Sequence, residues 1–337
     1  MVRVSETLTK KGHKKMPSKE VQINNTIVFS ECQEKNTPQF YEELQKSHKK
    51  NKKQLHQLAL SNDQVEKAGR IISCTNFLTY ELINQEFIRL KRINLCRERL
   101  CLNCQLVNSR KLIKQLFWSI PRLTIKNDER LYFLTLTTNN CSADELKDLI
   151  QYMCKRQVAF FRHYGITDYF RSVEITYNQE EQTYHPHLHI IFLVSKYSKF
   201  PFYNPAQGIY GANQLQKEWH EWLTHTNNGY KMATVYEIKD TKTIFELCKY
   251  ITKVKDLENF EVLKVLNEQL KGLRLKTPVG QFKTLAKAYK QECTSIKLQE
   301  LQFLEEAEIQ LINMLYNPKK KKYEVKSIAD KNIIYRM

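Results

Sequence analysis

The middle of the chain alternates between apolar and polar residues in a way that predicts β-strands. Residues 131–138, 171–178 and 185–194 are rich in β-branched and aromatic side chains, which favour strands, and residues 233–239 repeat the pattern. The turn-rich sequence QEEQTY separates the second strand from the third. We therefore expect these two strands to pair as an antiparallel hairpin.

Between the strands, apolar residues recur every three or four positions, which is the spacing typical of amphipathic helices. One helix is predicted after Ser142, which can cap it together with Glu145 three positions on. Two further helices are predicted over residues 213–226 and 243–255. The resulting order βαββαβα predicts an α+β fold, with an antiparallel sheet of about four to five strands and helices packed on one face.

The same pattern divides the chain into four segments. Residues 1–70 are polar and lysine-rich, and predict a basic, partly disordered extension that ends in a short helix. Residues 71–125 are expected to form a small cysteine-rich module, and residues 126–285 hold the strands and helices of the core. In residues 286–337, helical periodicity predicts a long C-terminal helix followed by a basic tail, and this helix could dock on the core or make a homo-oligomer.

The amino-acid composition indicates which class of partner the protein binds. The net charge is +18, from 54 Lys and Arg against 36 Asp and Glu, which indicates a protein that meets a polyanion. The eight glycines form neither GxGxxG nor GxxxxGK[ST], so a dinucleotide-binding fold and a P-loop ATPase lose their main signature. No segment approaches the ~18 apolar residues of a membrane helix, and the N-terminus has no apolar leader, so we expect a cytoplasmic protein without a membrane partner.

Three of the nine histidines fall on one predicted strand, as His185, His187 and His189. Alternate residues of a strand share a face, so the three imidazoles project to the same side of the sheet. Two imidazoles two positions apart can bind one divalent cation, which predicts a metal site. The alternative is a cluster of histidines on a solvated face.

A carboxylate is expected to join these histidines, because a cation that organises phosphates prefers oxygen as well as nitrogen ligands. If the hairpin closes with a four-residue loop, Asn178 pairs with Thr183, and counting back along both strands places Glu174 opposite His187. Glu174 then lies on the imidazole face. An exposed strand glutamate without a ligand role is the alternative.

The predicted helix 243–255 carries a second candidate site. Its apolar residues form one stripe, and Glu246, Tyr250 and Lys253 lie together on the other side because positions i, i+4 and i+7 share a helix face. A tyrosine hydroxyl can attack a phosphodiester and keep the strand end as a phosphotyrosine, with Glu246 handling a proton and Lys253 stabilising charge. The alternative is an ordinary surface tyrosine.

Cys74, Cys96, Cys101 and Cys104 lie close together in the sequence, and clustered thiolates suit Zn²⁺ in a closed tetrahedral site. Buried free thiols are the alternative. Basic residues near the cluster are candidates for contacts with DNA phosphates, namely Arg97, Arg99, Arg110 and Lys111.

Taken in order, these motifs resemble the HUH endonucleases, and in particular the plasmid rolling-circle replication initiators. The resemblance rests on CRERLCLNC, FLTLTTNN, HPHLHIIF and ELCKYITK. It implies that His187 and His189 bind Mn²⁺ or Mg²⁺ with Glu174. His185 shares their strand face and is a further candidate ligand. It also implies that Tyr250 is the nicking nucleophile and that Glu246 supports termination.

The resemblance further implies a function and its partners. The protein would nick single-stranded or hairpin plasmid origin DNA, and a host helicase and a DNA polymerase would extend the free end. Conjugative relaxases differ because their tyrosine precedes the histidine motif, and Leu102 departs from the family, which usually has proline there. Three alternatives stay open: a related transposase, a relaxase-like nickase, or a non-catalytic zinc-containing DNA-binding regulator.

Overall fold

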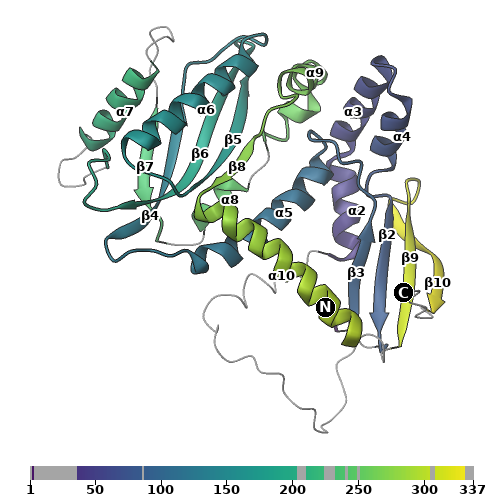
Figure 1. Cartoon of the computed structure of the whole chain (residues 1–337). Helices are drawn as coiled ribbons and strands as arrows, with labels where there is room; N and C mark the ends of the chain where they lie inside the picture. The colour runs from purple at the N-terminus through teal and green to yellow at the C-terminus, as the bar shows by residue number, and fades with distance from the viewer. Residues whose placement is uncertain are drawn as a thin grey trace. The chain divides into compact units, whose positions relative to one another are not determined.

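The chain divides into two compact units, of residues 1–98 with 295–337 and of residues 99–294 (Figure 1). The computed structural model describes residues 2–3, 36–85, 87–202, 210–223, 232–239, 242–248, 251–303 and 308–330. The boundary after Glu98 falls inside the segment expected to be a separate cysteine-rich module, and the C-terminal residues join the N-terminal ones. Among the described helices, none has the length and apolar character needed to cross a membrane.

The second unit contains a five-stranded antiparallel sheet in the order β7-β4-β6-β5-β8. Its strands are β4 Glu129–Thr137, β5 Tyr169–Asn178, β6 Thr183–Ser195, β7 Ala233–Glu237 and β8 Lys276–Val279. This confirms the predicted α+β fold. The sequence did not predict β8, because four residues that include a proline are too short to show alternation.

Helices cover both faces of this sheet, and the prediction of one covered face is wrong. On one face, α6 Leu146–His163 packs its Phe161 ring 5.1 Å from Phe192, and α7 Tyr210–Trp222 packs beside α6. On the other face, Ile191 packs in an apolar cluster with α5 Leu102–Ser119 and α8 Lys242–Leu247. β6 has apolar residues on both sides here, so both faces exclude water.

The helix predicted over residues 243–255 ends much earlier, at Leu247. The carbonyl of Ile251 instead accepts a hydrogen bond from Ile175 N of β5 at 2.8 Å, and residues 256–258 form a short 3₁₀ helix, Asp256–Glu258. A backbone carbonyl that pairs with a strand cannot continue the helical ladder. Lys253 therefore lies outside this helix.

In its described residues, the first unit combines three helices near the N-terminus with a second five-stranded antiparallel sheet, in the order β1-β3-β2-β9-β10. Its helices are α2 Pro38–Ser47, α3 Lys49–Ser61 and α4 Val65–Ser73. Its strands are β1 Val2–Arg3, β2 Phe77–Ile83, β3 Phe87–Ile93, β9 Ile309–Asn317 and β10 Lys322–Asp330. Residues 38–73 thus hold three helices where one short helix was predicted.

The C-terminal segment also differs from its prediction. The chain forms α9 Phe260–Gln269 and α10 Gln281–Phe303, but residues 309–317 are a strand rather than the end of a long helix. The expected basic tail contributes β10. Pairing of β9 with β2 supplies backbone hydrogen bonds that helical periodicity alone does not reveal (Figure 1).

A buried ion pair in the central strand of this sheet makes the stability of the first unit depend on pH. Glu81 of β2 is 2% exposed and accepts hydrogen bonds from Arg89 Nε at 2.9 Å and from Lys91. Burial acts to raise the pKa of Glu81, but the hydrogen bonds from Lys91 and Arg89 outweigh it and lower the pKa below 4.5. The charged form is therefore the one that stabilises the fold.

We expect Glu81→Gln to lower the free energy of unfolding by about 3 kcal/mol at pH 7, because two cations lose their buried partner. Since the folded pKa is depressed, this stabilisation is present above pH ~4.5 and is lost as the pH falls. Urea unfolding at pH 7 and pH 3.5 measures it, and the difference between the variant and the wild type should be smaller at the lower pH. The control is Glu324→Gln, which breaks an exposed pair with Lys320 and should cost less than about 1 kcal/mol. An equal loss at both pH values would contradict the assignment.

Candidate functional site

The hairpin of β5 and β6 has the register predicted from its loop. Asn178 pairs with Thr183 and Glu174 pairs with His187, so this prediction is confirmed. The turn closes locally, because Asn178 Oδ1 accepts hydrogen bonds from the backbone N–H groups of Glu180 and Glu181. The geometry of the loop thus carries Glu174 to the strand position beside the histidines.

Strand alternation gives β6 two different sides. His185, His187 and His189 are each partly exposed, whereas the intervening Pro186 and Leu188 are buried. The rings of His187 and His189 are nearly parallel, with centroids 6.0 Å apart, and the rings of His185 and His187 are 4.3 Å apart. The three imidazoles therefore form one row on the partly exposed side of the strand.

Glu174 reaches this row through a direct contact with His189. His189 Nε2 donates to Glu174 Oε2 at 2.8 Å, and Thr135 Oγ1 of β4 lies 3.2 Å from His189 Nδ1. His187 Nε2 lies 3.3 Å from Thr176 Oγ1 instead. Both nitrogens of His189 are thus held, which fixes the orientation of its ring.

His185 and His187 are poor bases. Burial, together with His185, His189 and Lys253, lowers the pKa of His187 to about 4, although Glu174 acts against the shift. Burial also lowers the pKa of His185. Both rings are therefore neutral near pH 7, which is the form that binds a metal ion. The effect of Lys253 on His187 also brings this lysine into the surroundings of the site.

The chemistry of these donors fits a divalent cation, because two neutral imidazoles and one carboxylate share a face of the sheet. Their ligand atoms do not surround one point, since Glu174 bonds to His189 while His187 Nε2 lies near Thr176. Within the described ranges, the four cysteines are the group whose ligand atoms gather closely enough to hold a metal ion.

The predicted nucleophile, Tyr250, lies outside the described residues, as does the side chain of Glu246. The next described residue, Ile251, is hydrogen-bonded to Ile175, the residue that follows Glu174 on β5. Lys253 is exposed. The described chain on the C-terminal side of Tyr250 therefore runs beside β5 at the level of the candidate metal ligands.

Sequence reasoning missed the threonines of β4 that lie opposite the histidines in the sheet. Thr135 pairs with His189 in the register of β4 and β6, and Thr137 pairs with His187. The signal was present in the motif FLTLTT, where threonines alternate with buried leucines. It identifies a polar face but not its neighbour, because strand order within the sheet does not follow from the alternation of one strand.

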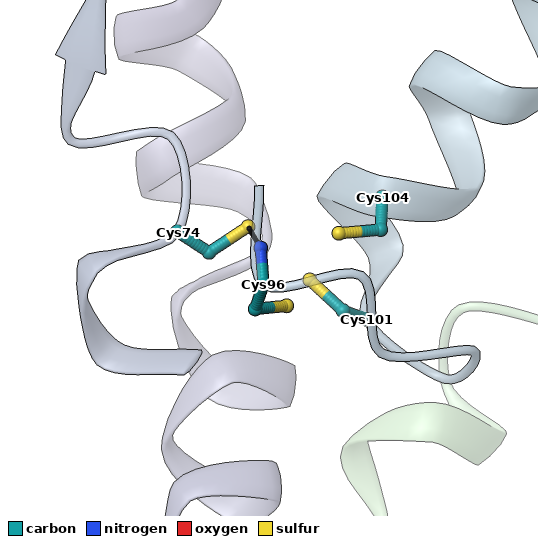
Figure 2. Close-up of side chains that lie close together, drawn as sticks. All are labelled: Cys74, Cys96, Cys101 and Cys104. Carbon is teal, nitrogen blue, oxygen red and sulfur yellow. Dashed lines mark hydrogen bonds between the residues drawn. The ribbon is translucent and has the colours of Figure 1, made fainter. Parts of the chain in front are cut away.

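The four predicted zinc ligands, Cys74, Cys96, Cys101 and Cys104, do gather in the structure (Figure 2). All four are buried, and their sulfur atoms lie within 4.8 Å of one another. Zn–S bonds of ~2.3 Å in a tetrahedron place sulfurs about 3.8 Å apart, so the cluster needs only a small contraction to hold zinc. Cys101 caps the N-terminus of α5 and Cys104 lies in its first turn, where the helix dipole favours thiolates.

We expect purified protein to contain about one zinc ion per chain, and Cys101→Ser to lose most of it. Because metal binding contributes directly to folding, Tm should fall by about 10 °C. Zinc content by atomic emission and Tm by circular dichroism measure both effects. Cys141→Ser, which changes a buried cysteine outside the cluster, is the matched control and should keep the zinc. Full zinc content in Cys101→Ser would rule out this thiol as a ligand.

The predicted DNA-contacting residues fall into different environments. Arg99 is engaged inside the second unit, where its guanidinium donates to the carbonyls of Leu270 and Leu273. Arg97 and Lys111 are exposed, and Arg110 is partly exposed. Arg99 makes this intramolecular contact but is also exposed, so all four residues stay predictions for phosphate contacts.

A strongly basic chain whose antiparallel sheet presents histidines and a glutamate on one face has the features of a protein that acts on nucleic acid. Its family is recognised directly, because a family model described as replication protein matches residues 87–324. The chain belongs to this replication protein family. The resemblance to plasmid replication initiators is thereby confirmed.

Curated proteins from several bacteria are also similar to this chain, and each of the three described next is called protein rep. One from Streptococcus pneumoniae serotype 2 is 29% identical over 232 residues, which cover 65% of this chain and 70% of the relative. One from a Bacillus species is 31% identical over 46% of this chain and 48% of the relative. One from Lentilactobacillus hilgardii is 26% identical over 66% and 75%. The chain thus aligns over about half to three quarters of these relatives. No solved structure shows significant similarity.

Proposed function

We propose that this protein initiates rolling-circle replication of a plasmid by nicking and later rejoining origin DNA through a covalent 5′-phosphotyrosine. The observation that carries the proposal is the arrangement around β5. Glu174 lies opposite His187 and contacts His189, and the next residue, Ile175, holds Ile251, which directly follows Tyr250 in the chain. The residue that follows Tyr250 and the candidate metal ligands thus contact adjacent residues of one strand.

In this proposal the phenolic oxygen of Tyr250 attacks the scissile phosphorus, and the bond from phosphorus to O3′ breaks. Tyr250 loses its proton, O3′ gains one, and the 5′-phosphate remains on the tyrosine. His187, His189 and Glu174 would hold Mn²⁺ or Mg²⁺, which polarises the scissile phosphate and stabilises charge in the transition state. Because the bond energy is conserved in the phosphotyrosine, the strand can later be rejoined.

Lys253 and Glu246 have roles other than nucleophilic attack. Lys253 contributes positive charge near His187, consistent with its effect on the pKa of that imidazole. Glu246 accepts a proton from water during termination, so that a second cleavage ends in hydrolysis instead of a new phosphotyrosine. The structure ends α8 before Tyr250, so these roles do not rest on a shared helix face.

The proposed substrate is single-stranded or hairpin origin DNA, held at its phosphates by exposed basic residues such as Arg97 and Lys111. The free 3′ hydroxyl would prime a host DNA polymerase, with a host helicase opening the duplex. These partners place the protein in the bacterial cytoplasm. A homo-oligomer is compatible with the proposal and is not required by it.

The test is a denaturing gel of protein incubated with labelled fragments of its own replicon and Mn²⁺ or Mg²⁺. We expect a nicked strand with a free 3′ end and a slower band of protein joined to the 5′ end. A nick without a covalent band would favour hydrolysis. Cleavage confined to a transfer origin or a transposon end would favour a relaxase or transposase. Binding without any cleavage would favour a zinc-containing regulator.

A further inference from the structure

A buried glutamine connects α5 to the chain beside the predicted nucleophile. Gln105 follows Cys104 in the first turn of α5 and is 7% exposed. Its Oε1 accepts a hydrogen bond from Ile251 N at 2.9 Å, and both residues are buried. Its Nε2 has no hydrogen-bond partner among the described residues. Burying an amide side chain costs free energy unless the side chain forms hydrogen bonds. The hydrogen bond to Ile251 N offsets part of this cost for Gln105.

The other side of Ile251 is held as well. Its carbonyl accepts from Ile175 N at 2.8 Å, so α5 fixes one polar group of this residue and β5 fixes the other. Farther along, Thr252 Oγ1 donates to Asp256 Oδ2 at 2.9 Å. Asp256 Oδ2 also accepts a hydrogen bond from Tyr177 N of β5 at 3.4 Å. The described chain that follows Tyr250 is therefore anchored at several points along β5.

The hydrogen bonds that hold this segment differ in origin: some come from the backbone of β5, and one comes from the side chain of Gln105. The contacts with Ile175 and Tyr177 come from backbone groups of β5 and set the distance of the segment from the sheet. Gln105 is a side chain from another element, α5, and it holds the amide of Ile251. Without it, that buried N–H has no acceptor, and the segment must shift or admit water to recover one.

We propose that Gln105 is a positioning residue for the nicking reaction: by holding the amide of Ile251, it restrains the chain that directly follows Tyr250 in the sequence. The inference rests on the proposed function, because it assigns Tyr250 as the nucleophile. Attack on a phosphate needs a near in-line approach, and a displacement of about 1 Å can reduce a rate by ~100-fold. Loss of the Gln105 hydrogen bond should therefore slow the chemical step and leave DNA binding unchanged.

The experiment compares single-turnover rates of phosphotyrosine formation at saturating origin oligonucleotide and Mn²⁺. We expect Gln105→Met to slow adduct formation by about tenfold or more, since it keeps the volume but removes the acceptor. The dissociation constant for the oligonucleotide should stay within about twofold. Gln105→Glu keeps an acceptor for Ile251 N–H and should recover most of the rate, which a role in packing alone does not predict.

Gln157 of α6 provides a matched control. It is fully buried, its Oε1 accepts from Arg171 Nη1 at 2.7 Å, and its Nε2 also lacks a partner among the described residues. It lies on the sheet face opposite the histidines, so Gln157→Met should lower Tm without a comparable loss of rate. Gln105→Met that reacts at the wild-type rate, or Gln105→Glu that reacts as slowly as Gln105→Met, would overturn the proposal. Wild-type protein without any covalent adduct would instead overturn the proposed function and this inference with it.

Discussion

Replacing Tyr250 with phenylalanine is expected to abolish covalent capture of a nicked origin strand while leaving DNA binding intact. The variant loses only the phenolic oxygen that the proposal joins to the 5′-phosphate, so adduct formation should fall by at least about 10⁴-fold, to the limit of detection. The adduct is measured as a band that survives denaturing electrophoresis, and binding is measured by anisotropy of the same labelled oligonucleotide.

A matched control keeps this result specific to the proposed nucleophile. Tyr197 follows β6 and is 76% exposed, so Tyr197→Phe removes an equivalent hydroxyl from the same unit. It should form the adduct at the wild-type rate. If Tyr250→Phe still captures the strand, another residue is the nucleophile, and mapping the labelled peptide would identify it.

Loss of the metal ligands should have the second largest effect. His187→Ala and His189→Ala each remove an imidazole from the row beside Glu174, and we expect nicking to fall by about 10³-fold, which corresponds to ~4 kcal/mol of transition-state stabilisation. Wild-type protein treated with a chelator should lose nicking to a similar extent. Adding Mn²⁺ or Mg²⁺ should restore the chelated wild type but not the variants.

The control must separate this site from the cysteine cluster, because a chelator can also remove zinc. His163 is an exposed histidine at the end of α6, so His163→Ala should leave nicking unchanged. The zinc content and Tm of His187→Ala should match the wild type, since its ligands differ from the four cysteines. Metal-independent nicking by the wild type would remove the basis for a catalytic cation at the histidines.

The register of the hairpin formed by β5 and β6 could be predicted from local sequence pattern alone. Loop length and two-residue alternation sufficed to place Glu174 opposite His187, because a strand pair joined by a short turn has few possible registers. The same local reasoning put the three imidazoles on one face. It also selected four cysteines whose thiols do gather, although the spacing of Cys74 from the other three carries no geometry of its own.

Local pattern was wrong where a distant strand supplied the hydrogen bonds. Residues 309–317 fit a helical period, yet they form β9 because β2 pairs with them from the other end of the chain. Residues 248–255 also fit a helical period, yet the helix ends at Leu247 and the carbonyl of Ile251 pairs with β5. In both cases the backbone found partners that no local window contains.

The amino-acid sequence by itself determined the chemistry available to this protein: its basic charge, its histidine row, its clustered thiols and the motifs that placed it among replication proteins. These depend on residue type and on periods of two or four residues, which are properties of a single strand or helix. The tertiary structure alone decided that Gln105 meets Ile251, that Thr135 holds His189 and that Arg99 is engaged by backbone carbonyls. Such contacts join residues far apart in the chain, and their geometry is set by how helices and strands pack rather than by the order of residues.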